Sequence, residues 1–228
     1  MADPDRYVAL ISSLPHHDSL FAAKVTPLSR QRLMQRLQDL EPTDHALLMQ
    51  VWRLVDWAQY SLDDDVARIT KRVRDVLAQL DNPCLCEMIA QRFELRTLVA
   101  GLRRRHRGET TPPPHKDWGY GRWLERMTRY WQEPGFRLER VYPWVFEADR
   151  LLGNDDPLGL ERLILRETWR QLDRIGAGHY FDFEAVVIYV MRWDLVDRWT
   201  RYDGEHALHR FHGLVEQGLN GYEQLFAG

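Results

Sequence analysis

The sequence predicts an all-α fold, and three observations support this class. Apolar residues recur every three or four positions along most of the 228-residue chain. No stretch alternates convincingly between apolar and polar residues, apart from a short possible extended start at 7–12. Gly, Pro, Asn and Asp separate the periodic stretches. With 44% hydrophobic residues, the chain can bury a real core as one large domain or two small ones.

The first half of the chain predicts four helices after residue 25. A threonine and a proline at 26–27 supply the cap and first turn of a helix that ends near Pro42. Thr43 starts the next helix, and the acidic run 63–65 favours the start of a third, because carboxylates stabilise helix N-termini. A fourth is expected at 83–106. The first three apolar stripes are Leu33, Met34, Leu37 and Leu40, then Leu47, Val51, Leu54, Val55 and Ala58, then Val66, Ile69, Val73, Val76 and Leu80.

The stretch 107–121, RGETTPPPHKDWGYG, is the best internal boundary. Its three consecutive prolines and three glycines cannot continue a helix and favour an extended, exposed connection. We therefore expect an N-terminal helical lobe at 1–106 and a C-terminal helical lobe at 122–228. The helices expected in the second lobe are 123–131, 143–152, 157–175, 182–202 and 205–222.

The segment 179–202, HYFDFEAVVIYVMRWDLVDRWTRY, is typical of a docking helix. Charged residues fill much of the space between its apolar positions, which predicts packing on one side and water or a partner on the other. Its tryptophans Trp193 and Trp199 are candidate anchors for a partner if they are exposed. The apolar positions are Val186, Tyr189, Val190, Trp193, Val196 and Trp199.

The densest group of charges is the run Arg103, Arg104, Arg105, His106 and Arg107. Consecutive side chains point in different directions around a helix, so the run predicts a broad positive surface. Phosphate binding, RNA contact and docking on an acidic protein all fit such a surface. The net charge of −3 argues against nucleic acid. The alternative is a solvated helix end, where cations are favoured by the helix dipole.

No motif predicts catalysis, and no cofactor is expected. The chain lacks a Gly-x-Ser-x-Gly elbow and lacks the GK[ST] and G-x-G-x-x-G contexts of phosphate loops. The acidic pair Asp155 and Asp156 directly precedes Pro157, where helix capping explains it. We therefore predict that the protein is not an enzyme.

The cysteines and histidines do not predict a metal centre. Cys84 and Cys86 lie two positions apart, where a disulfide would be strained in a helix, and no second cysteine pair completes a zinc site. The pair His16 and His17 follows Pro15 in a predicted loop and is expected to be solvated. Three later histidines would spread over about 120° of a helix without the usual glutamate partners. These are His206, His209 and His212.

The sequence predicts a cytoplasmic protein. Its N-terminus opens with Asp3 and Asp5, the reverse of a secretory signal, and no cleavage pattern follows. The longest charge-free apolar run, 185–191, is far below the roughly 18 residues that a membrane span needs. Any membrane association is therefore expected to go through a partner.

Three segments together carry a resemblance to a known family. They are YVALISSLP, RFELRTLVAGLRRRHRGE and FDFEAVVIYVMRWDLVDRW. They resemble a bacterial family of unknown function encoded beside V-type ATPases, which is itself similar to the rotor-socket subunit of V-type and archaeal-type ATPases. That subunit is all-helical and funnel-shaped, with internal pseudo-repeats, and seats the central shaft on the membrane rotor ring.

The resemblance implies how the repeats would map onto this chain. The basic ending at 103–105 with Gly108 is similar to the end of a repeat helix, and 183–199 is similar to the corresponding helix of a later repeat. The residues themselves also suggest a weak repeat, since Phe-Glu at 93–94 opens an apolar run that ends at 103–105 and Phe-Glu at 183–184 opens another that ends at Arg192. The full rotor socket has three repeats in a longer chain, so this chain would be a shortened form or an accessory factor derived from it.

The expected function is a non-catalytic, rotor-socket-like stalk or assembly component of a bacterial V-type ATPase, peripheral to the inner membrane through that complex. Its partners would be the central shaft and the rotor ring. An unrelated helical chaperone or adaptor is a second hypothesis, and an all-α enzyme that uses the histidines is a third. The residues expected to dock on the partner are Arg103, Arg104, Arg105, Arg107, Trp193 and Trp199.

Overall fold

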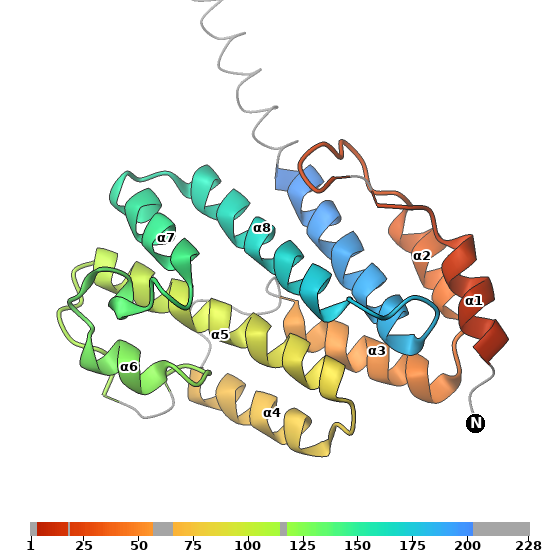
Figure 1. Ribbon diagram of the computed structural model, residues 1–228, viewed down its shortest axis with the longest axis horizontal. Helices are drawn as coiled ribbons and strands as arrows, with labels where there is room; N and C mark the ends of the chain where they lie inside the picture. The colour runs from red at the N-terminus through yellow and green to blue at the C-terminus, as the bar shows by residue number, and fades with distance from the viewer. Residues whose placement is uncertain (1–3, 18, 57–65, 115–117, 203–228) are drawn as a thin grey trace, which may run out of the picture.

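The computed structural model describes residues 4–17, 19–56, 66–114 and 118–202. In these ranges the backbone is helical or irregular and contains no strand, which confirms the all-α class. The long helix α5 lies in the middle, flanked by α3, α4, α7 and α8 (Figure 1). The helices are α1 (Pro4–Ser13), α2 (Arg30–Leu37), α3 (Pro42–Val55), α4 (Val66–Gln79), α5 (Pro83–His106), α6 (Leu124–Arg129), α7 (Pro143–Gly153), α8 (Pro157–Ile175) and a stretch at 183–202, with a 3-10 turn, η2 (Pro134–Arg137), before α7.

Prolines and capping side chains set the helix starts. Proline occupies the first turn of α3, α5, α7 and α8, where its missing N–H is not needed. The side chains of Asn82 and Asp156 each accept the backbone N–H three positions further on, at 3.1 and 2.7 Å. Asp156 is thus the predicted cap. Helix α2 begins at Arg30 after the cap Ser29, later than Pro27 suggested. The helix expected at 205–222 lies outside the described residues.

Helix α1 corrects the expected extended start of the chain. Tyr7, Leu10 and Leu14 are spaced by three and four positions and are all buried on one side. The Tyr7 hydroxyl also donates a hydrogen bond to the carboxylate of Asp44 in α3. The short segment 7–12 follows the helical period because this face packs on the core.

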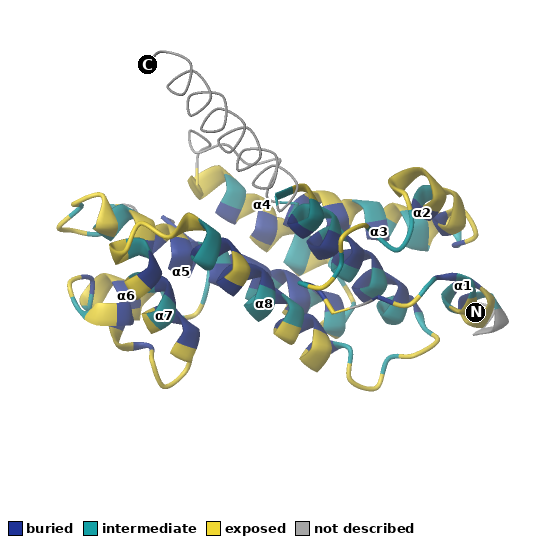
Figure 2. Ribbon diagram, turned by 90° about the horizontal axis from the view of Figure 1, so that it is seen from above, coloured by how far each residue is buried: buried dark blue, intermediate teal, exposed yellow. Residues whose placement is uncertain are grey.

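Two clusters of buried apolar residues form the core. The larger joins residues from 7–93 with residues from 165–199, and the smaller joins 95–102 with 118–164. The core therefore does not divide where the predicted lobes divide, because the last helices return to pack on the first ones. Helix α5 contributes to both clusters, and Figure 2 shows it largely in the dark blue of buried residues.

The Pro/Gly-rich stretch after α5 is irregular, as predicted, but it is not a free connector. The indole N–H of Trp131 donates to the carbonyl of Glu109 at 2.8 Å. At the other end Trp118 is buried, and its indole N–H donates to the Thr128 hydroxyl at 3.3 Å. Both ends of this stretch are therefore fixed on the smaller cluster, beside α6.

Three buried polar residues in the middle of α5 fix its neighbours. Arg92 donates to the hydroxyl of Thr168 in α8 at 2.6 Å. Glu94 accepts the backbone N–H of Arg122 at 3.1 Å and also a hydrogen bond from the Tyr142 hydroxyl. Thr97 accepts the backbone N–H of Tyr120 at 2.8 Å. Each of these residues has a hydrogen-bond partner inside the protein, as burial requires.

The 183–202 helix is a core helix. Each of residues 182–200 is buried or only partly exposed, so the helix offers little surface to a partner. Its apolar stripe packs as predicted, but its charged residues are partly covered by neighbouring helices. Arg198, for example, holds Glu161 of α8 through two hydrogen bonds of 2.6 and 2.9 Å. Across the described ranges, no helix is long and apolar enough to cross a membrane.

Trp193 and Trp199 are buried, which corrects their expected role in docking. Trp193 is 1% exposed, and its indole N–H donates to the carbonyl of Leu28 at 2.9 Å. Trp199 is 5% exposed and packs edge-on against Phe21, with 5.1 Å between the ring centroids. The helical period predicted the apolar face but could not show that the N-terminal segment covers it.

The two Phe-Glu pairs occupy different places in their helices. Phe93 and Glu94 lie in the middle of α5, whereas Phe183 and Glu184 lie in the first turn of the 183–202 helix. Both phenylalanines are buried, but the pairs do not open equivalent helices. The pseudo-repeat stays a prediction.

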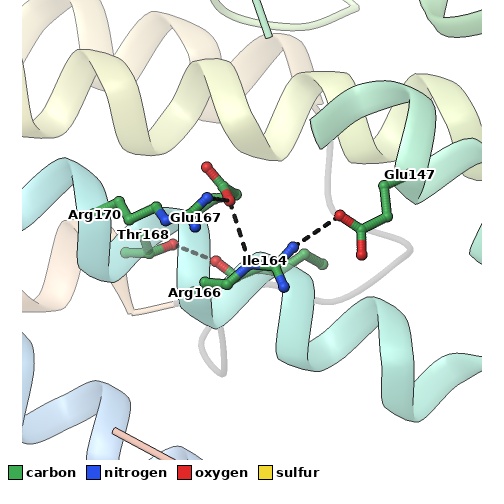
Figure 3. Close-up of polar contacts among 6 residues, drawn as sticks. All are labelled: Glu147, Ile164, Arg166, Glu167, Thr168 and Arg170. Carbon is green, nitrogen blue, oxygen red and sulfur yellow. Dashed lines mark hydrogen bonds and ion pairs between the residues drawn. The ribbon is translucent and has the colours of Figure 1, made fainter. Parts of the chain in front are cut away.

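An ion pair joins α8 to α7, and another lies within α8. Arg166 contacts Glu147 of α7 at 2.8 Å, and Glu167 contacts Arg170 of the same helix at 2.8 Å (Figure 3). Figure 3 also shows the hydroxyl of Thr168 donating to the carbonyl of Ile164, at 2.9 Å. Surface ion pairs contribute only about 0 to 1 kcal/mol each, so the apolar contacts of α7 and α8 carry most of the stability.

We expect Trp193→Ala to lower the free energy of unfolding by about 3 to 5 kcal/mol, because it leaves a large cavity in the core. The matched aromatic control is Tyr180→Ala. The Tyr180 side chain is 71% exposed, so this substitution should change the free energy of unfolding by less than about 0.5 kcal/mol. Urea unfolding followed by circular dichroism measures both. Equal losses in the two variants would contradict the assignment of Trp193 to the core.

Thr97→Val should remove the acceptor of the partly buried backbone N–H of Tyr120 and lower the free energy of unfolding by about 1 to 3 kcal/mol. Hydrogen exchange at the Tyr120 amide should become faster in this variant. Thr111→Val, at an exposed position, is the control and should change neither quantity. Unchanged exchange at Tyr120 would show that Thr97 does not hold the 118–122 segment.

Candidate functional site

A pocket of about 570 Å³ lies along the C-terminal half of α5. Its floor comes from α5, one wall from α4 and another from residues 118–120, while Leu152 and Arg198 contribute from α7 and the 183–202 helix. We call it the arginine pocket after five of its lining residues. The lining residues are Val66, Ile69, Thr70, Phe93, Arg96, Thr97, Val99, Ala100, Arg103, Arg104, His106, Arg107, Trp118, Gly119, Tyr120, Leu152 and Arg198.

Helical spacing brings the arginines of α5 together. Arg96, Arg103 and Arg107 lie seven and four positions apart and therefore share one face of the helix. Arg104 lies beside them on the same side of α5. Arg198 reaches the pocket from a segment almost a hundred residues later.

The pocket is positively charged. Its lining includes five arginines and no carboxylate among the described residues. Carboxylates from outside the lining offset part of this charge. Glu109 pairs with Arg104 at 3.0 Å and lies 3.9 Å from Arg107, and Glu161 pairs with Arg198 at 2.6 Å. A surplus of positive charge remains at the end of α5, around Arg103 and the largely exposed Arg107.

Arg103 is the cation best placed to bind a ligand. Among the described residues its side chain makes no hydrogen bond and no ion pair, although it lines the pocket. Burial lowers the pKa of its guanidinium, the nearby Glu161 opposes this, and Arg198 and Arg107 lower the pKa further. Although the residue as a whole is exposed, its guanidinium is partly desolvated and lies near other cations, so an anion that enters the pocket stabilises it.

Aromatic side chains line one wall of the pocket, which we call the aromatic wall. Phe93 of α5 and Tyr120 pack edge to face, with 6.3 Å between the ring centroids. Burial raises the pKa of the Tyr120 hydroxyl, so the hydroxyl stays neutral at physiological pH. Trp118 and Tyr120 are held by their hydrogen bonds to Thr128 and Thr97, so the wall is in place before a ligand binds.

Gly119 is required where this wall crosses α5. A Cβ atom at this position would lie 2.3 Å from the methyl carbon of Thr97 and 3.1 Å from the side chain of Leu124. No side chain fits there without moving the segment away from α5. The glycine therefore sets the distance between the aromatic wall and the helix.

The structure brings together three of the four arginines that the sequence singled out. Arg103, Arg104 and Arg107 line the pocket, and the side chain of Arg107 is 60% exposed. Arg105 points away from it, which corrects its predicted docking role. Its side chain is 15% exposed, pairs with Asp149 of α7 and hydrogen-bonds the backbone at 131 and 133. Arg105 stabilises the fold, because its position on α5 faces α7 and its side chain contacts that helix.

Sequence reasoning missed Arg96 and Arg198. The seven-residue spacing from Arg96 to Arg103 was a usable signal, since it places both on one face of α5. Nothing in the sequence could have pointed to Arg198, because its approach depends on how the 183–202 helix packs. Both residues make further contacts within the protein.

The histidine predictions have mixed outcomes. His17, expected to be solvated, is 8% exposed and stacks on Tyr189, with 4.3 Å between the ring centroids. Its Nε2 atom lies 3.1 Å from the carbonyl oxygen of Tyr189. The histidines at 206, 209 and 212 lie outside the described residues. His106 lines the pocket and lies 3.4 Å from Asp155.

One group of potential metal ligands occurs in the described part of the chain. Ligand atoms of His179, Asp182 and Glu184 all lie within 4.8 Å of one another. Each of these side chains already has a hydrogen bond or an ion pair that accounts for its position without a metal. Asp182 caps the 183–202 helix and pairs with His179 at 2.7 Å, while Glu184 accepts from Asn82 at 2.8 Å. The expected absence of a bound metal stays a prediction.

Cys84 and Cys86 are free thiols in the first turn of α5. Burial raises the pKa of Cys84 to about 11, and the carboxylates of Glu184 and Asp182 contribute to this rise. The thiol is therefore protonated at neutral pH, and a protonated thiol is a poor nucleophile. This argues against Cys84 as a catalytic residue.

The arrangement as a whole is suited to binding anions. The arginines can hold oxyanions through paired hydrogen bonds, and the aromatic wall can hold an apolar group beside them.

Comparisons with protein-family models, curated proteins and solved structures find no match for this chain. The assignment of this site therefore rests on its own residues.

Arg105→Ala should lower the free energy of unfolding by about 1 to 3 kcal/mol, because it removes charge-assisted hydrogen bonds and leaves Asp149 without its partner. Arg103→Ala should change it by less than about 0.5 kcal/mol. Thermal and urea unfolding of the two variants provide the comparison. The reverse order of stabilities would mean that the two arginines have been assigned the wrong roles.

Proposed function

We propose that this chain is a non-catalytic, rotor-socket-like stalk or assembly component of a bacterial V-type ATPase. In this role it links the central shaft to the membrane rotor ring. The observation that carries the proposal is the surplus of positive charge at the end of α5, which suits an acidic surface on a partner protein. The all-helical build is consistent with the resemblance on which the expectation first rested.

The docking surface in this proposal consists of Arg103, Arg104 and Arg107. Arg103 and Arg107 are exposed, and Arg104 is partly exposed beside them. Exposed charge pairs steer association and set its salt dependence more than they set affinity. Apolar contacts must supply the rest of the binding energy, and neither Trp193 nor Trp199 is available for them.

The proposed location in the cell follows from the proposed partner. The protein would act in the cytoplasm, peripheral to the inner membrane, and would reach the membrane only through ATPase subunits. Nucleic acid is not a proposed partner, because the chain as a whole carries a net charge of −3.

A helical chaperone or adaptor unrelated to the rotary ATPase is the second candidate. The observation that favours it is an exposed aromatic pair, Tyr180 and Phe181, which are 71% and 52% exposed. Exposed aromatics of this kind are common anchors of protein interfaces. They lie in the loop between α8 and the 183–202 helix.

We expect the double charge reversal Arg103→Glu with Arg107→Glu to lower recovery of ATPase subunits roughly tenfold in affinity purification from the native membrane fraction. The fold should persist, since both side chains are exposed. The control Arg129→Glu with Arg140→Glu makes the same change in net charge at exposed positions that do not line the pocket, and recovery should stay unchanged.

Two outcomes would reject this proposal. If the wild-type chain recovers no ATPase subunit, the rotary ATPase is not its partner. If both double variants recover the subunits as well as the wild type, at low and at high salt, the arginines do not dock. Recovery of other proteins that depends on Tyr180 and Phe181 would favour the adaptor.

A further inference from the structure

We propose that the arginine pocket binds a small organic phosphate that carries a planar ring. The phosphate groups would bind at Arg103 and its neighbouring arginines, and the ring would lie against the aromatic wall at Tyr120, since Phe93 and Trp118 behind it are almost fully buried. This binding site goes beyond the proposed docking function, because it needs no ATPase subunit.

The size and shape of the pocket support a small ligand. Its volume of about 570 Å³ falls within the range of about 300 to 1,000 Å³ that is usual for small-molecule sites. It extends past the exposed arginines to Phe93 and Val99, which are buried in the core clusters. A flat acidic surface could contact Arg107 at the rim but could not reach these inner residues.

The charges select an anion of high charge density. Arg96, Arg103 and Arg107 come from one face of α5, and guanidinium groups bind phosphate through pairs of parallel hydrogen bonds. Among the residues that the structure describes, the lining offers no carboxylate to repel such a group. The side chain of Arg103 has no ion pair to give up within the described ranges, so binding breaks none at this residue.

The apolar part of the lining selects an organic phosphate over inorganic phosphate. Val66 and Ile69 of α4 face the same space as the aromatic wall. An inorganic anion would leave this half of the pocket in contact with water only. A planar ring would cover it, and aromatic stacking adds stabilisation beyond the area buried.

The wall is fixed before any ligand arrives. Trp118 and Tyr120 are each held by a hydrogen bond, and Gly119 between them lets the segment approach α5 closely. A preformed site loses less conformational entropy on binding. The structure thus provides a rigid aromatic wall and a row of cations facing the same volume.

The test is isothermal titration calorimetry of the full chain with three probes: adenosine triphosphate, inorganic pyrophosphate and adenosine. We expect the triphosphate to bind most tightly, pyrophosphate more weakly and adenosine most weakly of all. Arg103→Ala should weaken binding of the triphosphate roughly tenfold to a hundredfold, as expected for the loss of charge-assisted hydrogen bonds. The matched control Arg129→Ala, at another exposed arginine in the last turn of a helix, should bind like the wild type.

A second variant tests the aromatic wall. Tyr120→Ala should weaken binding of the triphosphate but leave the affinity for pyrophosphate within about twofold, since the ring contacts only the organic part. Circular dichroism and thermal unfolding confirm that each variant is folded before titration. A variant that fails to fold is replaced by Tyr120→Leu, which keeps much of the apolar volume and removes the aromatic face.

Several results would overturn the inference. Absence of binding by both the triphosphate and pyrophosphate excludes a phosphate site. Equal weakening by Arg103→Ala and Arg129→Ala means that binding is a non-specific effect of charge. Equal affinities for triphosphate and pyrophosphate exclude a role for the ring. None of these results bears on recovery of ATPase subunits from membranes, so the docking proposal stands or falls separately.

Discussion

Helix α5 is flanked by α3, α4, α7 and α8, and the polar groups that it buries must find partners in these helices or in the 118–122 segment and Tyr142. Burial lowers the pKa of Arg92 to about 10, yet the guanidinium remains charged at neutral pH beside Thr168 and near Asp194. A cavity of about 20 Å³, room for about one water molecule, lies between these groups. Because Arg92 needs both the Thr168 hydroxyl and the nearby Asp194 carboxylate, it fixes α8 and the 183–202 helix against α5.

The same helix creates the candidate site. The large apolar residues of α5 are buried as far as Leu102, and the arginines that follow reach the surface on the sides that α7 does not cover. Arg105 turns toward α7 and pairs with Asp149, while Arg103 and Arg107 line the pocket. Thr97 and Gly119 then set how closely the aromatic wall approaches the row of cations.

Much of the fold follows from sequence patterns, whereas the site follows only in part. Proline and capping signals located α5 and α8 because those signals act within one helical turn. The burial of Trp193 could not be foreseen, since its cover comes from residues more than a hundred positions earlier. Local charge density singled out both Arg103, which lines the pocket, and Arg105, which faces α7, because spacing along a helix does not reveal which face a neighbouring helix covers. The contribution of Arg198 depends entirely on tertiary packing.

The central claim is that the arginines that line the pocket form one anion site, while Arg105, which faces α7, stabilises the fold. Nitrogen-15 spectra of the arginine Nε–H groups, recorded while pyrophosphate is added, test this most directly. The account predicts saturable shifts for Arg103 and Arg107 and none for Arg105, which is already engaged by Asp149. Shifts of the same size and midpoint at Arg129 would contradict it, because they would show that pyrophosphate does not distinguish the pocket from any exposed arginine.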